Sequence, residues 1–444
     1  MICCYGEWDI CLTPINYLIM NYIIKNGVYI VDGVKKSCIY DCNNDKHYWI
    51  DVDTSRYLRK LVNKEIEEEN QGIISAAIEF EILERSDNIE SKAHWPNINK
   101  LFNFPRHIDY AWIELTNLCN LRCTHCYNET KQRIKKSLTY EDFVHVVDEL
   151  TTFGIKAVQL IGGEPFIIKE DLLFKMLDYA SVSFDEFEIF FNGTLTNRSH
   201  LERIKQNYPN CKIAMSLHSF IREEHEKVTQ VKGSYDKSVA TLQNLKDLKI
   251  PFRYVGIYAN GIDIGEELDF GVPYRRDYIR LTGRGNLLHY NRQLLSEKII
   301  TLDTFKFNNL EATLKSTYSE SCFANYLYIG SDMNVYPCVM ERRICHGNLK
   351  NHSLTEILDK KLVNFSKEDV NECKQCEFRH ICKDCRPDSI SMKINDKPWY
   401  CSYDVEAGEW TDINTFIDEI LYNKENLKSA TIIQYTIKGR FMSR

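Results

Sequence analysis

The sequence predicts an α/β fold in which a parallel β-sheet, open or closed into a barrel, is covered by helices. The first observation is that, from residue 109, short apolar runs alternate with helical patterns, as in parallel sheets with covering helices. The second is that cysteines and polar residues gather at the ends of the apolar runs. Ligands of such folds bind at the carboxyl ends of the strands, so these residues should share one site.

Six strands and three helices are expected in this region. The strands are YAWIEL at 110–115, KAVQLIGGEP at 156–165, EFEIFFNGT at 186–194, CKIAMSLH at 211–218, FRYVGIYA at 252–259 and DYIRLTGRG at 277–285. The helices lie at 138–154, 171–180 and 237–248. The first should begin after Thr139, three residues before Asp142, and end at Gly154, because a hydroxyl and a glycine are typical helix boundaries.

The N-terminal region reads as a separate small α+β domain. Residues 36–52 predict two strands around an Asn-Asn-Asp turn, and residues 55–83 carry helical spacing. A polar stretch follows. We therefore expect an N-terminal domain at 1–90, a linker at 91–107, the sheet domain at 108–300 and an irregular cysteine-rich domain at 301–444.

Composition restricts the function. The chain has 444 residues, of which 44% are hydrophobic and 27% charged, as in soluble proteins of two or three domains. A net charge of −7 without a basic run argues against nucleic acid as a partner. There is no signal-peptide pattern and no run long enough for a membrane helix, so a cytoplasmic location is expected. In a reducing compartment, clusters among 17 cysteines indicate metal binding or catalysis.

The stretch LTNLCNLRCTHCYNE places Cys119, Cys123 and Cys126 within eight positions. Disulfides need pairs, and a structural zinc ion needs four ligands. Three thiolates suit a four-iron, four-sulfur cluster whose fourth iron is open to a small molecule. A partial zinc site completed by a distant residue is the alternative, because thiolates bind both metals.

This loop resembles the Cys-x3-Cys-x2-Cys signature of the radical S-adenosylmethionine (SAM) enzymes, with His125 in the aromatic-type position before the last cysteine. The resemblance, over about residues 108–290, implies a partial parallel (β/α)6 barrel. It also implies that the open iron chelates the amino and carboxylate groups of SAM. Reductive cleavage of SAM then gives a 5′-deoxyadenosyl radical that abstracts hydrogen.

The resemblance also implies contacts to the cofactor at the strand ends. Family positions for these contacts are matched by Gly162, Gly163, Glu164, Asn192 and Ser216, together with His125. Glycines let the backbone approach a ligand, and the Glu164 carboxylate suits the ammonium of SAM. His218 stands where many relatives carry aspartate and is expected to be structural. Arg284 resembles a late-strand arginine of relatives.

The C-terminal third carries a second cysteine cluster, CKQCEFRHICKDC at 373–385. Spacing alone leaves structural zinc ribbons open. Behind a radical SAM core the cluster resembles a SPASM domain, which binds two auxiliary [4Fe–4S] clusters. Two departures from that family's pattern are the two-residue gap Lys383–Asp384 and Met333 in place of a glycine. The resemblance assigns Cys373, Cys376, Cys382 and Cys401 to one cluster, and Cys322, Cys338 and Cys385 to the other.

Relatives with a SPASM domain modify peptides, many of them ribosomally made. The resemblance therefore implies a maturase that installs a cross-link, with a thioether favoured, in a precursor peptide. Its N-terminal domain would be a winged-helix-like module that grips the leader by strand addition, or else a structural cap. An electron donor such as flavodoxin or ferredoxin would be needed. The alternatives are oxidation of a serine or cysteine in a sulfatase, and an iron–sulfur electron carrier without chemistry of its own.

The remaining cysteines have no such assignment. Cys345 is either the eighth auxiliary ligand or a packed thiol, and the sequence leaves the roles of Cys3, Cys4, Cys11, Cys38 and Cys42 open. If Cys345 is not a ligand, the cluster on Cys322, Cys338 and Cys385 keeps one open iron. An open iron favours a thiolate, so a substrate cysteine would be its natural ligand.

Overall fold

The computed structural model describes residues 21–66, 68–85, 108, 110–128, 136–305, 321–358, 365–389 and 393–426. The chain divides into two compact units, a smaller N-terminal one and a larger one that begins after Pro96. The expected linker at 91–107 and the cysteines at positions 3, 4 and 11 lie outside the described residues. In the described ranges, no helix has the length and apolar character needed to cross a membrane.

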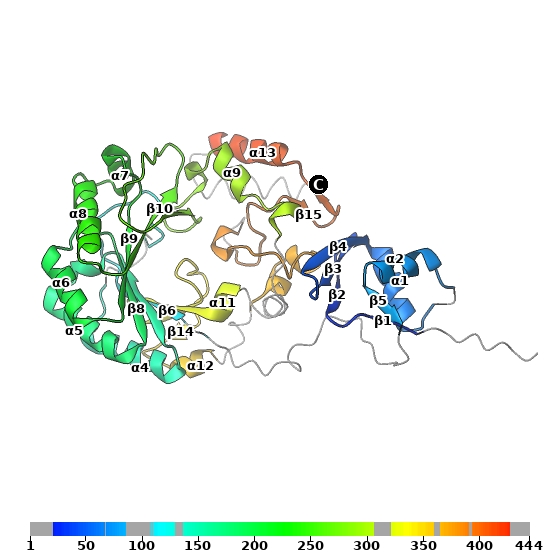
Figure 1. Ribbon diagram of the computed structural model, residues 1–444, viewed down its shortest axis with the longest axis horizontal. Helices are drawn as coiled ribbons and strands as arrows, with labels where there is room; N and C mark the ends of the chain where they lie inside the picture. Colours follow the sequence, from blue (N-terminus) through cyan, green and yellow to red (C-terminus); the bar gives the residue numbers. More distant parts are fainter. Residues whose placement is uncertain are drawn as a thin grey trace, which may run out of the picture. The chain divides into compact units, whose positions relative to one another are not determined.

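The N-terminal unit is a small α+β domain, as expected (Figure 1). Its strands β2 (Val28–Asp32), β3 (Lys36–Asp41) and β4 (Lys46–Asp51) form an antiparallel sheet, and β1 (Tyr22–Ile24) pairs with β5 (Leu83–Arg85). The expected strand pair is confirmed as β3 and β4. The expected helical spacing at 55–83 corresponds to two helices, α1 (Val52–Val62) and α2 (Gln71–Glu79). The side chain of Asn70 caps and starts α2, so the helices are separate.

Six parallel strands form the centre of the larger unit. They are β6 (Tyr110–Thr116), β7 (Ala157–Gly162), β8 (Glu186–Phe191), β9 (Cys211–Ser216), β10 (Phe252–Tyr258) and β11 (Tyr274–Tyr278). They follow one another in chain order, and every neighbouring pair is parallel. The predicted parallel sheet, consistent with a partial barrel, is confirmed. The last strand was expected at 277–285; it starts at Tyr274, so only its end overlaps the prediction.

Helices cover the outer face of this sheet, as Figure 1 shows for α5, α6 and α8. They are α4 (Tyr140–Phe153), α5 (Glu170–Ser183), α6 (Arg198–Asn207), α7 (Arg222–Thr229) and α8 (Ser234–Asp247). The predicted limits of α4 are confirmed, since Thr139 accepts a hydrogen bond from the Asp142 amide and Gly154 adopts a φ of 100°. The main core lies between helices and sheet and includes Phe143 and Ile189, both fully buried.

The cysteine-rich region adds to the same sheet. Strand β12 (Tyr326–Ile329) pairs in parallel with β6, and β13 (Asn334–Tyr336) and β14 (Gly347–Asn348) follow antiparallel. The buried Glu114 carboxylate on β6 accepts hydrogen bonds from the Ser331 amide and hydroxyl, both at 2.8 Å. The sheet therefore continues across the expected domain boundary at residue 300.

A second core joins the remaining C-terminal elements. Fully buried Trp399 and Tyr290 pack there with α9 (Arg292–Lys298) and α13 (Ile413–Asn426). The short elements α11 (Ser321–Asn325), α12 (Leu354–Leu358), β15 (Tyr403–Asp404) and β16 (Glu409–Trp410) complete the described part. Most of this region is loop, which matches the expected irregular domain.

The helix-to-sheet core can be tested with two leucines of the larger unit. Leu177 on α5 is fully buried, whereas Leu288 is 49% exposed. We expect Leu177→Ala to lower the free energy of unfolding by about 2–5 kcal/mol, because it removes buried methyl groups and leaves a cavity. Leu288→Ala should change it by less than about 0.5 kcal/mol. Denaturant unfolding of both variants measures this, and equal losses would contradict the described packing.

Candidate cluster and cofactor site

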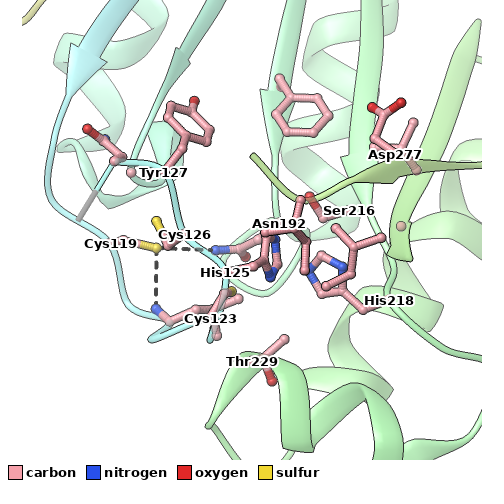
Figure 2. A pocket seen from close by; sticks show the side chains of 18 of the residues that line it. Cys119, Cys123, His125, Cys126, Tyr127, Asn192, Ser216, His218, Thr229 and Asp277 are labelled. Carbon is pink, nitrogen blue, oxygen red and sulfur yellow. Dashed lines mark hydrogen bonds between the residues drawn. The ribbon is translucent and has the colours of Figure 1, made fainter. Parts of the chain in front are cut away.

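The three-cysteine loop follows the carboxyl end of β6 and opens onto a cavity of about 210 Å³. Figure 2 shows the sulfurs of Cys119 and Cys126 side by side at this cavity. The other walls come from the ends of β7 to β11 and from α7. Of the residues predicted to contact the cofactor, Gly162, Gly163, Asn192, Ser216 and His125 line the cavity. The predicted gathering at the strand ends is therefore present.

The glycine turn after β7 fixes the start of the loop. The Gly163 amide donates to the Thr116 carbonyl at 2.7 Å, and the Glu164 amide donates to the Leu118 carbonyl at 2.8 Å. A Cβ atom at Gly162 would lie 2.1 Å from the Thr116 oxygen, and one at Gly163 would lie 2.1 Å from the Leu118 oxygen. Both glycines are thus required for close backbone packing against the loop, as well as for access to a ligand.

Two further segments hold the rest of the loop. The amides of Arg122 and Thr124 donate to the carbonyls at the end of α7, at 3.0 and 2.9 Å. From the other side, the Arg284 amide donates to the Cys126 carbonyl at 2.9 Å. Burial raises the pKa of the Cys123 thiol, and the positive charge of Arg284, the predicted late-strand arginine, opposes part of that rise. The loop is therefore positioned by backbone contacts before any ligand binds.

Burial dominates the electrostatics of two of the three thiols, those of Cys119 and Cys123. Burial raises the pKa of Cys119 to about 11 and that of Cys123 to about 12. The neighbouring thiols add to both shifts, which places the three sulfur atoms close together. Thiolates in this position are unfavourable without a positive charge beside them, and bound metal supplies that charge.

Glu164 is placed differently from its prediction as a direct cofactor contact. Its side chain is fully buried, and its carboxylate accepts hydrogen bonds from the amides of Asn192 at 2.8 Å and Phe166 at 3.0 Å. It is not among the residues that line the cavity. Burial raises its pKa to about 7. In this structure Glu164 joins the ends of β7 and β8, and its contact with a cofactor stays a prediction.

Asn192 connects the loop to the strand ends. Its Nδ2 atom donates to Asn120 at 3.0 Å and lies 4.0 Å from the Cys119 sulfur, as the dashed line in Figure 2 shows. Its Oδ1 atom accepts hydrogen bonds from the amide and hydroxyl of Thr194, at 2.8 and 2.6 Å. The side chain is thus held with its amide nitrogen toward the cysteine loop.

Two buried histidines, His218 and His225, lie side by side with the half-buried His125 on one wall. The ring of His125 meets that of His218 edge-on at 4.9 Å, and His218 stacks on His225 at 5.6 Å. Burial lowers the pKa of His125 to about 3 and that of His225 to about 4, so both are neutral. The Nδ1 atoms of His125 and His218 have no hydrogen-bond partner in the described part of the chain. His218, expected to be structural, therefore faces the same cavity as the predicted ligand contacts.

Sequence reasoning missed two charged residues of the cavity, Asp277 and Arg280. Both lie at or just after the carboxyl end of β11, within the stretch that was read only as a strand. Their charge at the end of an apolar run was the signal that could have identified them. Figure 2 shows Asp277 on the side of the cavity opposite the cysteine loop.

The residues present fit an iron–sulfur cluster together with SAM. Three soft thiol ligands lie at one side of the cavity, and buried polar atoms without partners lie on its wall. Unsatisfied buried polar groups are costly in a folded protein, and a bound polar ligand removes that cost. Asn192 and Ser216 add side-chain polar groups to the same cavity.

The cysteines of the C-terminal region form two groups. Burial raises the pKa of Cys376 well above its usual value, and Cys373, Cys401 and Cys382 each add to the shift. These four are the set that the resemblance assigned to one auxiliary cluster. In the second group, burial raises the pKa of Cys338 to about 11, and Cys322 adds to this shift. Burial also raises the pKa of Cys385, and Cys338 adds to that shift.

Cys345 stands apart from both groups. It is exposed, and its sulfur lies 3.4 Å from the Gly347 carbonyl oxygen. Burial and Asp332 raise its pKa, with no other cysteine among the causes. Within the described ranges, no three His, Cys, Asp or Glu side chains are placed to hold a single metal ion.

Comparison with known proteins agrees with the two domain types that the resemblance implied. Residues 113–271 match the Radical SAM superfamily, and residues 322–386 match SPASM, an iron–sulfur cluster-binding domain. The chain is 24% identical over 328 residues to AlbA of Bacillus subtilis (strain 168), an antilisterial bacteriocin subtilosin biosynthesis protein, covering 68% of this chain and 72% of AlbA. It is 29% identical over 140 residues to SkfB of the same organism, a sporulation killing factor maturation protein, covering 31% and 33%.

Other relatives act outside peptide maturation. The AdoMet-dependent heme synthase of Methanosarcina barkeri is 23% identical over 348 residues, which cover 68% of this chain and 97% of the synthase.

Among solved structures, Streptococcus suis SuiB bound to precursor peptide SuiA has 14% identity and a TM-score of 0.48, covering 84% of this chain and 98% of SuiB. The chain therefore contains a radical SAM domain and a SPASM domain, and it is an enzyme that binds SAM, a [4Fe–4S] cluster and auxiliary iron–sulfur clusters.

Proposed function

We propose that this enzyme installs a thioether cross-link in a ribosomally made precursor peptide that carries a cysteine. The observation that carries the proposal is the second auxiliary group, in which Cys322, Cys338 and Cys385 act on one another and no fourth thiol of the described residues joins them. AlbA and SkfB, which are named for bacteriocin biosynthesis and killing-factor maturation, support a peptide as the substrate.

Cys119, Cys123 and Cys126 hold the cluster of the radical SAM domain in this proposal. Cofactor contacts come from the cavity residues Gly162, Gly163, Asn192, Ser216 and His125. Glu164, which does not line the cavity, is the further contact that the resemblance implies. When bound, SAM and its cluster supply a 5′-deoxyadenosyl radical that removes a hydrogen atom from the substrate. The protein contributes a loop held by backbone contacts, a cavity at the strand ends, and polar wall atoms that orient the cofactor.

The auxiliary groups have different roles. Cys373, Cys376, Cys382 and Cys401 supply four thiolates, enough to complete one [4Fe–4S] cluster. Cys322, Cys338 and Cys385 supply three, and the position of Cys345 leaves the fourth place for another ligand. A cysteine thiolate of the substrate suits that place, because such iron favours thiolates. Deprotonated and held there, its sulfur is ready for bond formation.

The N-terminal unit grips the leader of the precursor in this proposal. Strand β4 is an edge of the β2–β3–β4 sheet and carries Trp49, which is 38% exposed. Tyr48 on the same strand contacts the ring of Phe80 at 5.5 Å, and Phe80 is 52% exposed. An edge strand next to exposed aromatic side chains suits an extended peptide that adds as a further strand. In this proposal the enzyme is located in the cytoplasm and receives electrons from a flavodoxin or a ferredoxin.

The first test concerns the radical SAM cluster. Reduced, reconstituted protein should convert SAM to 5′-deoxyadenosine, and Cys123→Ala should abolish this, because two thiolates do not retain the cluster. Cys211→Ala is the matched control, since Cys211 is a buried core thiol on β9 away from the cavity. Liquid chromatography of the products measures both. Undiminished cleavage in Cys123→Ala would overturn the assignment of the site.

The second test counts metal. Three four-iron clusters require about twelve irons per chain. We expect Cys345→Ala to keep that number, together with the electron paramagnetic resonance (EPR) signals of both auxiliary clusters, whereas Cys338→Ala should lose about four irons. Addition of a cysteine-containing precursor should shift one auxiliary signal, and the same peptide with serine should not. Loss of a cluster in Cys345→Ala would assign Cys345 as a ligand and reject the open position.

The third test concerns leader binding. Trp49→Ala should weaken binding of the leader by about tenfold or more, since truncating a central aromatic contact commonly costs about 2 kcal/mol. SAM cleavage should stay unchanged. Fluorescence anisotropy with the labelled leader of a precursor encoded beside this gene measures the affinity. Tyr422→Ala is the control, because Tyr422 is an exposed aromatic residue on α13, in the larger unit. Unchanged affinity in Trp49→Ala would exclude the β4 edge as the leader site.

A further inference from the structure

A buried ion cluster stands behind the cavity wall. The Asp388 carboxylate is fully buried, and its Oδ2 atom pairs with Arg280 Nη1 at 3.3 Å and with Lys298 Nζ at 3.6 Å. Its Oδ1 atom accepts a hydrogen bond from the Leu281 amide at 2.9 Å. The Lys298 side chain is 12% exposed and that of Arg280 is 27% exposed. One carboxylate therefore faces two cations that are largely removed from water.

The cluster connects the SAM cavity to an auxiliary thiol. Arg280 lines the cavity that the three-cysteine loop opens onto. At the other end, the Asp388 amide donates to the Cys385 carbonyl at 2.9 Å, so the carboxylate and the expected ligand Cys385 share one tight turn. Arg280 and Lys298 each lower the pKa of the Cys385 thiol, against the larger effect of burial. Both cations therefore act electrostatically on this thiol.

Tyr400 extends the connection to the second auxiliary group. Its hydroxyl accepts a hydrogen bond from the Cys385 amide at 2.8 Å, and the Lys298 ammonium lies 4.3 Å from the centre of its ring. The next residue in the chain is Cys401, an expected ligand of the other cluster. Lys298 thus lies beside Tyr400, whose hydroxyl contacts the Cys385 backbone and whose neighbour in the chain is Cys401.

The charges of Arg280, Lys298 and Asp388 do not cancel unless the auxiliary site contributes negative charge. Two cations and one carboxylate leave a net positive charge in a buried position, which is costly unless a negative charge lies nearby. A cluster bound through thiolates supplies that negative charge, and supplies more of it after reduction. Nearby positive charge stabilises the reduced form through Coulomb attraction, which is strong where water is excluded.

We propose that Lys298 and Arg280, held by Asp388, raise the reduction potential of the auxiliary cluster on Cys385 and so make it the electron acceptor of the reaction. The inference rests on the proposed function. Joining a C–H carbon to an S–H sulfur releases one hydrogen atom to the deoxyadenosyl radical, one proton to water and one electron. An iron–sulfur cluster bound through Cys322, Cys338 and Cys385 would supply the oxidant for that electron, and Arg280 and Lys298 would hold positive charge near it. Lys298 is a positioning residue here, since it contacts neither substrate nor cofactor.

The experiment measures the potential directly. The full chain with Cys119→Ala, Cys123→Ala and Cys126→Ala combined lacks the radical SAM cluster, so redox titration followed by EPR reports the auxiliary clusters alone. The signal that is lost on adding Cys338→Ala identifies the cluster of interest. In the same background, Lys298→Met should shift its potential to a more negative value. Lys298→Arg, which keeps the charge, should stay near the parent.

Two further variants complete the test. Lys237→Met removes an exposed lysine on α8 and should shift nothing. Asp388→Asn removes the negative partner and should shift the potential in the opposite direction, to a more positive value. A potential that is unmoved in Lys298→Met, or that moves equally in Lys298→Arg, would overturn this inference and leave the proposed function intact. Absence of any auxiliary signal in the parent would overturn both.

Discussion

The close backbone approach between the glycine turn of β7 and the cysteine loop of β6 is the constraint on which the rest of the site depends. Any side chain at Gly162 or Gly163 would collide with a carbonyl oxygen of Thr116 or Leu118. The turn then brings Glu164 beneath the end of β8, where its carboxylate fixes the Asn192 backbone. Three neighbouring strand ends are thereby joined without a ligand, so the positions of the thiols are set by the protein.

This arrangement changes how the glycine–glycine–glutamate motif should be understood. The buried Glu164 carboxylate accepts hydrogen bonds from backbone amides, so in this structure it holds neighbouring strand ends together. The polar groups left for a ligand are instead on the wall, at His125, His218 and Ser216. A buried neutral histidine donates and accepts hydrogen bonds without adding charge, so it can orient a zwitterionic cofactor without favouring one end of it.

The cysteines of the C-terminal region lie in different electrostatic environments. Cys373 lies where Lys367, Arg386 and Lys397 lower its pKa against burial, and a bound cluster there is shielded by fixed cations. Cys345, by contrast, is exposed and away from the other thiols. The link to the sheet through β12 and the Glu114–Ser331 contacts attaches this region to the parallel strands. The auxiliary sites and the radical site therefore belong to one continuous structure.

Local patterns in the sequence determined the elements that short-range physics controls. The alternation of apolar runs fixed the strands from β6 to β10, and the Thr139 and Gly154 signals fixed the limits of α4, because caps and periodicity act within one turn. The spacing of Cys119, Cys123 and Cys126 identified the site, since three thiolates in one loop restrict the chemistry by themselves.

Only the tertiary structure decided which distant residues meet. The resemblance grouped Cys385 with Cys338, and only the fold brings the two thiols close enough to act on each other. The same long-range packing brought Arg280 and Asp388 together across 108 residues. No periodicity records such contacts, because they depend on how separate elements pack and on the charge that burial must balance.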